Sequence, residues 1–398
     1  MNVSSEVIPN TIQETDLLDF LFHFAFRNHS SIAVWQLPGM NSRLVVLAKE
    51  TRKVNRDETL EDMESGFIFA PFDRDAEAVL IPAWLQFRLS DDRLAAPVGP
   101  VETYSHEWLK GNFRHDSDKR PTPFHSRDEG VISREFDYID LVKKSIREIE
   151  SGSFEKVVPS RRKTVNLAES FDMIHAFLKV CTAYSQAFVS LVSSPDTGTW
   201  IGASPEELVR VSDKTIFKTV ALAGTQPYHD GINLRKVAWT QKEIEEQALV
   251  ERYIISCFKK IRLREYDEFG PKTVIAGNLM HLKSEFTVNM KETNFPQLAS
   301  TMLRLLHPTS AVCGVPLEPA REFLRMNEGY SRGFYAGYLG PVNIDNQIDI
   351  FVNLRCMQLL KSRAVLYAGA GVTIDSTPEQ EWEETEMKMN TLLRVIQY

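Results

Sequence analysis

The residues near the C-terminus of this 398-residue chain have the types and spacing of a cation-binding site. Glu381 and Glu384 are three positions apart and Lys388 follows four positions later, so a helix would place all three side chains on one face. Two carboxylates on one face can bind a hard cation such as Mg²⁺, which needs few carboxylates and accepts oxygens from a substrate. This segment alone leaves open the alternative of a solvated face with an ordinary glutamate–lysine pair.

A second acidic pair and two glycines extend this set of candidate residues. Glu243 and Glu246 are also three positions apart, within a long helical pattern at residues 236–260. Gly369 and Gly371 alternate just after an apolar, strand-like segment, where glycine lets the backbone approach a ligand closely. Neither feature is specific by itself.

Three charged residues lie in or next to apolar, strand-like segments, where an unpaired charge is costly to bury. Lys156 precedes a Val-Val pair, Glu206 follows a Gly-Ala-Ser-Pro sequence, and Arg355 ends an apolar run. An edge position that faces water is the alternative for each of them. His281 and His307 also lie beside apolar residues, and most histidines in such settings are structural.

Several helices and strands must position these residues. Helical spacing of apolar residues predicts helices at 17–26, 134–151, 236–260, 296–306, 317–327 and 378–397. Strand patterns occupy 31–37, 43–48, much of 154–225, 272–289 and 332–373. The polar, proline-containing residues 114–130 are typical of an exposed loop. These elements predict an α+β protein with large antiparallel sheets and flanking helices.

Composition limits the class of protein. The chain is 43% hydrophobic and 25% charged, which is ordinary for a globular protein. Its net charge of −8 argues against a nucleic-acid binder, and no apolar run of about 18 residues predicts a membrane span. The first residues lack the basic and apolar regions of a secretory signal, so we expect a cytoplasmic protein. Four widely spaced cysteines favour buried, reduced thiols over a zinc site.

Taken together, these segments resemble the chorismate-utilising enzymes: isochorismate synthase, salicylate synthase, and the large subunits of anthranilate and aminodeoxychorismate synthase. The matching segments occur in the family's order at 154–161, 201–206, 222–225, 307–309, 313–316, 328–337, 368–371 and 381–388. The resemblance implies an anthranilate synthase component I-like fold, α+β, with large antiparallel β-sheets packed together and flanked by helices. It implies a divergent N-terminal part at 1–130 and a chorismate-binding catalytic region at 131–398.

The resemblance also implies which residues form the site. In this family Mg²⁺ is held by glutamates on two helices, which match Glu246 and Glu384, with Glu381 nearby. Positions that match substrate contacts are Gly224, Thr225, His281, Arg355, Gly371 and Lys388. Because chorismate is a dianion, its burial needs compensating cations, and Mg²⁺, Arg355 and Lys388 would supply them.

Three features favour a family member that uses water as the nucleophile. Lys156 stands where the ammonia-using anthranilate synthases usually carry glutamine, and Ala223 stands where aminodeoxychorismate synthases place a nucleophilic lysine. The Leu-Leu-Glu-Ser sequence of anthranilate synthases is absent from residues 1–60. We therefore expect an isochorismate synthase, an isomerase without an obligatory amidotransferase subunit. Lys156 would be the general base for water attacking C2, and Glu206 the general acid for the departing C4 hydroxyl.

Other members of the family remain alternatives. Salicylate synthases share the same lysine and glutamate and then eliminate pyruvate, but they often carry threonine near the position of Ala311. The sequence at 159–162 looks more like the anthranilate branch, and Gln247 replaces a histidine found in many members. A non-catalytic homologue that acts as a binding subunit is a third possibility. The sequence does not distinguish between menaquinone and siderophore biosynthesis.

Overall fold

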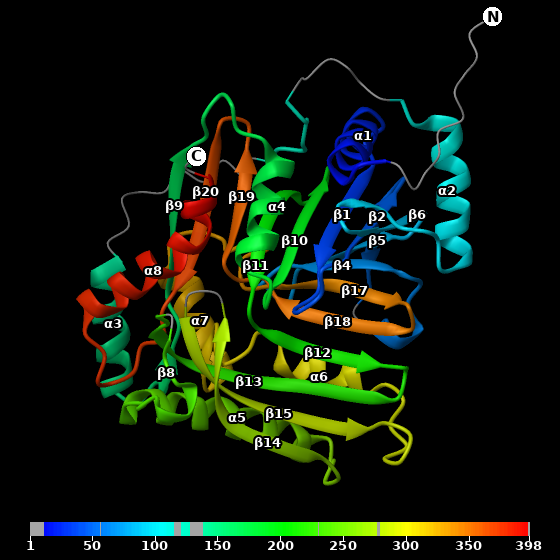
Figure 1. The fold of residues 1–398 in the computed structure, drawn as a ribbon. Coiled ribbons are helices and arrows are strands. Elements are labelled where there is room, and N and C mark those ends of the chain that lie inside the picture. The colour runs from blue at the N-terminus through cyan, green and yellow to red at the C-terminus, as the bar shows by residue number, and fades with distance from the viewer. Residues whose placement is uncertain are drawn as a thin grey trace, which may run out of the picture.

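Two large antiparallel sheets form the body of the protein. The computed structural model describes residues 12–55, 57–114, 121–127, 138–229, 231–276 and 279–396. The first sheet has nine strands in the order β7 (Arg93–Leu94), β6 (Leu85–Ser90), β2 (Arg43–Ala48), β1 (Ser31–Gln36), β10 (Phe188–Ser194), β11 (Gly198–Ser204), β19 (Cys356–Leu360), β20 (Arg363–Gly369) and β9 (Ser160–Asn166). Figure 1 shows its strands running roughly upright, nearly at right angles in the view to those of the second sheet.

The second sheet also has nine strands. Their order is β14 (Asp267–Ala276), β15 (Leu279–Asn289), β13 (Ile216–Pro227), β12 (Glu207–Ser212), β18 (Gln347–Val352), β17 (Tyr338–Ile344), β4 (Gly66–Ala70), β5 (Ala78–Pro82) and β3 (Arg52–Val54). A separate two-stranded ladder pairs β8 (Lys156–Val157) with β16 (Gly314–Val315). Both large sheets therefore combine strands from the first hundred residues with strands from the last third of the chain.

The helices pack outside the two sheets. The helices α1 (Glu14–Arg27), α4 (Met173–Ala183) and α8 (Pro378–Ile396) cover the outer face of the first sheet, and α2 (Pro100–Asn112) packs on β6. The helices α5 (Gln241–Lys260) and α6 (Leu298–Leu306) pack on the second sheet, against β13 and β12. The remaining helices are α3 (Tyr138–Glu150), which packs on α8, and α7 (Leu317–Asn327), beside β16.

The largest hydrophobic core lies between the sheets. Trp35 and Phe188 of the first sheet meet Phe67 and Phe351 of the second, and the rings of Phe188 and Phe351 stack with centroids 4.2 Å apart. All four side chains are at most 1% exposed. Such close packing holds the sheets at a fixed relation, which the functional site requires because its residues come from both.

The structure confirms the predicted α+β class with large antiparallel sheets and flanking helices. Two helices were not predicted: α2, and α4, which lies within a segment interpreted as alternating strands and turns. The helix α4 buries residues such as Phe177 and Val180 and exposes His175 and Thr182. Asp172 caps it by accepting a hydrogen bond from the His175 N–H. Most of the predicted loop at 114–130, and the first residues of the predicted 134–151 helix, lie outside the described residues.

Candidate active site

Most of the predicted site residues line one cavity beside the end of β20, although they come from distant parts of the chain. Those on its wall are Glu206, Gly224, Thr225, Glu246, His281, Arg355, Gly371, Glu384 and Lys388. The cavity has a volume of about 80 Å³. Small-molecule sites usually occupy about 300–1,000 Å³, so a substrate must displace some of these side chains as it enters.

Lys156 lies behind this wall and reaches it through Glu246. The lysine is 1% exposed, and its Nζ donates a hydrogen bond to Oε1 of Glu246 on α5 at 2.8 Å. Burial alone would raise the pKa of Glu246, but Lys156, Lys388 and Lys242 outweigh it and hold the pKa below its ordinary value. Gly371 packs directly on the pair, because a Cβ at this position would lie 2.8 Å from Oε1 of Glu246 and 3.0 Å from Cε of Lys156. The glycine predicted for close approach thus approaches the two charged groups themselves.

Glu206 is the buried carboxyl group of the cavity. It is 7% exposed and lies just before β12, and its Oε1 accepts a hydrogen bond from the Thr309 hydroxyl at 3.1 Å. Burial raises its pKa to about 7, against the opposing effects of Thr309, Lys156 and Lys388. A carboxyl group with such a pKa is partly protonated at neutral pH and can donate a proton.

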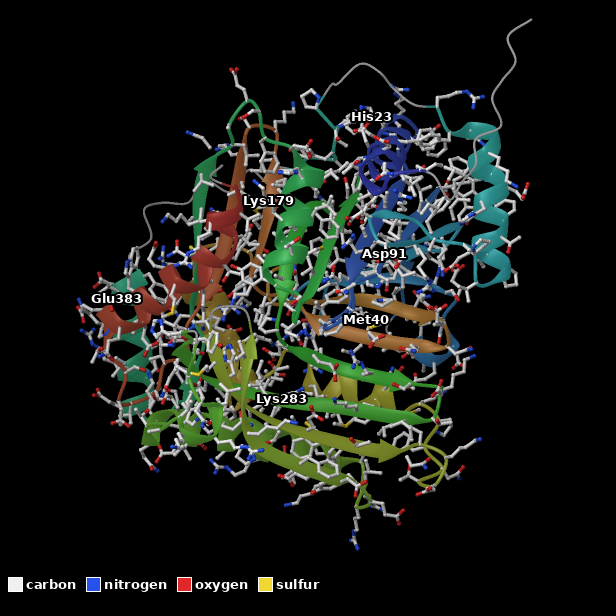
Figure 2. All side chains as sticks on the ribbon, viewed as in Figure 1. His23, Met40, Asp91, Lys179, Lys283 and Glu383 are labelled. Carbon is white, nitrogen blue, oxygen red and sulfur yellow. The ribbon has the colours of Figure 1, made fainter. Side chains whose placement is uncertain are left out.

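In the first turns of α8, some acidic side chains face the interior of the protein and others face the outside. Glu381 is 1% exposed and Glu384 lines the cavity, whereas Glu383 lies on the outer surface of the helix, as Figure 2 shows. Lys388 joins this inner face, with its Nζ 2.6 Å from Glu384 and 2.8 Å from the Gly369 carbonyl oxygen. The predicted common face of the helix is present, and it is directed inwards.

Glu381 is not part of the cavity wall and has a different partner. Its Oε1 accepts a hydrogen bond from Lys242 of α5 at 2.8 Å, while its Oε2 is buried without a hydrogen-bond partner among the described residues. Burial and then Glu384 raise the pKa of Glu381. The three acids predicted for a metal are thus each held by one lysine: Glu246 by Lys156, Glu381 by Lys242 and Glu384 by Lys388.

These carboxylates fit Mg²⁺ in a limited way. Within the described part of the chain, no group of three or more histidine, cysteine, aspartate or glutamate side chains is close enough to hold a metal ion. Mg²⁺, however, is usually bound by only one or two carboxylates, with waters and substrate oxygens as its other ligands. Glu246 from α5 and Glu384 from α8 supply that number on one cavity, so the donor set is compatible with Mg²⁺.

Two further side chains in the cavity have unused hydrogen-bonding groups. Arg355, which adopts a left-handed backbone conformation with φ of 47°, forms no side-chain hydrogen bond or ion pair with any described residue. His281 donates a hydrogen bond from Nδ1 to the Gly224 carbonyl oxygen at 2.8 Å, and its buried Nε2 has no hydrogen-bond partner among the described residues. Burial, and then Arg355, lower the pKa of His281 to about 3, so its ring is neutral. Because Nδ1 of the neutral ring carries the proton that is donated to the carbonyl, Nε2 is left as a hydrogen-bond acceptor. An unpaired guanidinium in such a site suits an anionic ligand.

Three residues near the site were not predicted from the sequence. Tyr335 and Tyr367 line the cavity, and their rings stack with centroids 5.3 Å apart. Tyr335 belongs to a segment that matched the family, but its side chain was given no role. Lys242 precedes the acidic pair of α5, and only the fold brings it to Glu381. An additional lysine in a helix rich in acids carries no signal in the sequence.

The sequence of this chain is similar to that of a known enzyme family. Residues 93–397 match the family described as "Chorismate binding enzyme". Because the match covers more than half of the chain, the protein belongs to this family of chorismate-binding enzymes.

Several relatives that match in sequence are isochorismate synthases. The isochorismate synthase DhbC of Bacillus subtilis is 28% identical over 309 residues, which cover 75% of this chain and 74% of that protein. The isochorismate synthase EntC of Escherichia coli is 26% identical over 67% of this chain and 68% of its own. A salicylate synthase of Mycolicibacterium paratuberculosis is 28% identical over 66% of this chain and 58% of its own.

Solved structures show the same fold. The menaquinone-specific isochorismate synthase MenF of Escherichia coli aligns with a TM-score of 0.71 at 21% identity, covering 95% of this chain and 91% of its own. Anthranilate synthase component I of Streptococcus pneumoniae aligns with a TM-score of 0.67 at 17% identity, covering 91% and 92%. At these identities the alignments establish the fold and not the activity.

In the described residues, no helix has both the length and the apolar character needed to cross a membrane.

Proposed function

We propose that the protein is an isochorismate synthase, an isomerase that converts chorismate to isochorismate with Mg²⁺ as cofactor. The observation that carries the proposal is that Glu206, a buried carboxyl group with a pKa of about 7, shares its cavity with Glu246, the partner of the buried Lys156. The reaction needs a proton donor and a proton acceptor at one substrate. Glu206 has the chemistry of the donor and Lys156 that of the acceptor.

Glu206 would act as the general acid. The C4 hydroxyl of chorismate leaves as water only if it receives a proton, and burial keeps the carboxyl group of Glu206 partly protonated at neutral pH. The Thr309 hydroxyl, 3.1 Å away, fixes the orientation of the carboxyl group. Once Glu206 has given up its proton, Lys388 and Arg355 stabilise the resulting carboxylate.

Lys156 would act as the general base for the water that attacks C2. In the structure its Nζ is committed to Glu246, so it can accept a proton only after that hydrogen bond is released. Arg355, with no partner among the described residues, and Lys388 would bind the substrate carboxylates. Glu246 and Glu384 would hold Mg²⁺, which when bound supplies positive charge for the ring carboxylate. Glu381 stays a predicted ligand or support of this metal site.

Ala311 favours isochorismate over salicylate as the product. This residue lines the cavity. Salicylate synthases, which this chain resembles, often carry threonine near this position. A methyl group at this position offers no hydroxyl to assist the elimination of pyruvate.

The cytoplasm is the proposed location, and no amidotransferase subunit is required because water is the nucleophile.

Product analysis with chorismate and Mg²⁺ tests the proposal. Purified protein should form isochorismate alone, as resolved by chromatography, and Lys156→Gln and Glu206→Gln should each lose most of this activity. Salicylate together with pyruvate would instead identify a salicylate synthase. If no product forms with water or with added ammonia, the protein is a non-catalytic homologue.

A further inference from the structure

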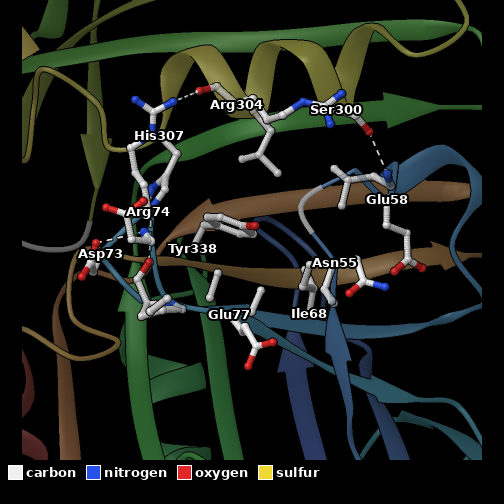
Figure 3. A pocket seen from close by; sticks show the side chains of 18 of the residues that line it. Asn55, Glu58, Ile68, Asp73, Arg74, Glu77, Ser300, Arg304, His307 and Tyr338 are labelled. Atoms are coloured by element: carbon white, nitrogen blue, oxygen red, sulfur yellow. Dashed lines mark hydrogen bonds between the residues drawn. The ribbon is translucent and has the colours of Figure 1, made fainter.

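A second and larger cavity lies on another part of the second sheet. Its volume is about 510 Å³, and it shares no lining residue with the candidate active site. It is enclosed by the segment that runs from β3 to β5, by α6 and by β17, as Figure 3 shows. A volume in the range of about 300–1,000 Å³ is typical of small-molecule sites.

The inner walls of this cavity are apolar. Ile68 of β4 and Leu303 of α6 form part of them. Leu60, in the short 3-10 helix Leu60–Asp62, and Met63, directly after that helix, form another part. These four side chains are between 1% and 6% exposed. Such walls favour a ligand with an apolar body.

Two aromatic residues supply an uncharged polar wall. The rings of His307 and Tyr338 meet edge to face, with centroids 4.9 Å apart. Burial lowers the pKa of His307 to about 4 and raises that of Tyr338 to about 12, so both rings are neutral near pH 7. The Tyr338 hydroxyl points towards the middle of the cavity in Figure 3 and has no hydrogen-bond partner among the described residues. It is therefore available to a ligand.

The charged residues around the cavity largely satisfy one another. Glu58 accepts two hydrogen bonds of 2.7 Å from Arg52, and Glu77 lies 2.6 Å from the ammonium group of Lys53. Arg74 donates to the Arg304 carbonyl oxygen at 2.7 Å. A ligand that brought its own charge would have to compete with these contacts, so an uncharged molecule fits better.

A short stretch of backbone joins this cavity to the candidate active site. His307, on the cavity wall, is two residues before Thr309, whose hydroxyl donates to Glu206 at 3.1 Å. His307 is itself held by a contact of 3.2 Å between its Nε2 and the Pro71 carbonyl oxygen. Any movement of this segment away from its present position weakens the hydrogen bond from Thr309 to Glu206.

We propose that the cavity is an effector site for a small, uncharged aromatic molecule that hydrogen-bonds to Tyr338, and that its occupancy weakens the Thr309–Glu206 hydrogen bond. The apolar walls, the neutral aromatic pair and the internally paired charges define the ligand class. The effect on catalysis rests on the proposed function, because it acts through the residue assigned as the general acid.

Ligand-observed NMR with benzamide as the probe tests the binding. Benzamide should bind the wild-type protein, and Ala76→Trp should weaken the binding at least tenfold, because this exposed alanine lines the cavity and a tryptophan would fill its opening. Ala96→Trp, at an exposed alanine outside the cavity, is the matched control and should bind as the wild type does. Tyr338→Phe should weaken binding by roughly 2- to 12-fold, the effect of one neutral hydrogen bond. No binding, or equal binding by all four proteins, would overturn the proposal.

Infrared titration of Glu206 tests the connection without requiring turnover. The carboxyl band that disappears in Glu206→Gln identifies the residue, and its titration should move upwards by roughly one pH unit when benzamide is bound, since a lost hydrogen bond destabilises the carboxylate. The shift should be absent in Ala76→Trp and present in Ala96→Trp. Binding without such a shift would overturn the proposed connection, whereas failure to convert chorismate contradicts only the proposed function.

Discussion

Replacing Gly371 with alanine should impair catalysis while leaving the fold intact. The added methyl carbon would lie 2.8 Å from Oε1 of Glu246, about 0.6 Å inside the 3.4 Å at which ordinary contact begins, and 3.0 Å from Cε of Lys156. The backbone at Gly371 is not in the left-handed region, so alanine adds no backbone strain. The strain falls on the lysine–glutamate pair, which must separate or shift.

The expected size of the effect follows from the precision that catalysis requires. A misplacement of about 1 Å can reduce a rate by about 10²-fold, so a shift of roughly half that distance should lower kcat/KM by about 10- to 100-fold. Steady-state kinetics with chorismate and Mg²⁺ would measure this loss, and thermal unfolding would show a Tm close to that of the wild type.

Gly111→Ala is the matched control for this substitution. Gly111 lies on α2, far in sequence from the site, and an added methyl there meets no atom within 4 Å. Alanine is favoured over glycine by about 1 kcal/mol in a helix interior and by less in the last turn, where Gly111 lies, so this variant should be fully active and at least as stable as the wild type. If Gly371→Ala retained kcat/KM within twofold of the wild type, the assigned closeness of Gly371, Lys156 and Glu246 would be refuted.

Three further outcomes follow from the electrostatics. Burial raises the pKa of Glu206 to about 7, and the acid works in its protonated form, so kcat should fall about tenfold per pH unit above pH 7. The residual activity of Glu206→Gln should lack this fall at alkaline pH. A wild-type kcat that stays constant up to about pH 9 would contradict the assignment. Lys242→Met should free Glu381 and strengthen Mg²⁺ binding by roughly tenfold in calorimetric titrations. Lys110→Met, at an exposed lysine on α2, is the control and should leave Mg²⁺ affinity unchanged. Equal Mg²⁺ affinities of the two variants would show that Lys242 does not act on the metal site. Arg332→Leu should destabilise the protein by about 3–5 kcal/mol in urea unfolding, because it leaves Glu328 buried without its cation. Arg325→Leu, which breaks only an exposed pair with Glu322, should change stability little, and similar losses in both variants would contradict this reasoning.

The sequence predicted the fold class and the elements that carry the site, because their patterns are local. The helix predicted at 317–327 agrees with α7, and the strand predicted at 43–48 agrees with β2. The α4 helix was missed because nearly every residue in it is apolar or β-branched, which hides the 3.6-residue period. Its capping residue, Asp172, was the signal that could have revealed it.

The grouping of the site residues came from the family resemblance and not from the residues themselves. Neither the position of Lys156 behind Glu246 nor the pairing of Glu381 with Lys242 follows from local spacing, since each joins segments about 90 or more positions apart. The orientation of the acids on α8 likewise depends on which face of the helix packs inwards. Local sequence patterns do not predict such contacts, because they form only when the fold brings distant segments together.

The order of strands in the second sheet has a consequence for how the protein is made. β4 is synthesised early, but its partner β17 begins about 270 residues later in the chain. At about 5–20 residues per second, the ribosome takes roughly 15–50 seconds to cover that distance. Until β17 is made, β4 has only one of its two neighbours in the final sheet, β5. The N-terminal strands must therefore wait, shielded from other nascent chains, until the last quarter of the protein emerges, and conditions that slow translation should increase aggregation before they reduce the activity of molecules already folded.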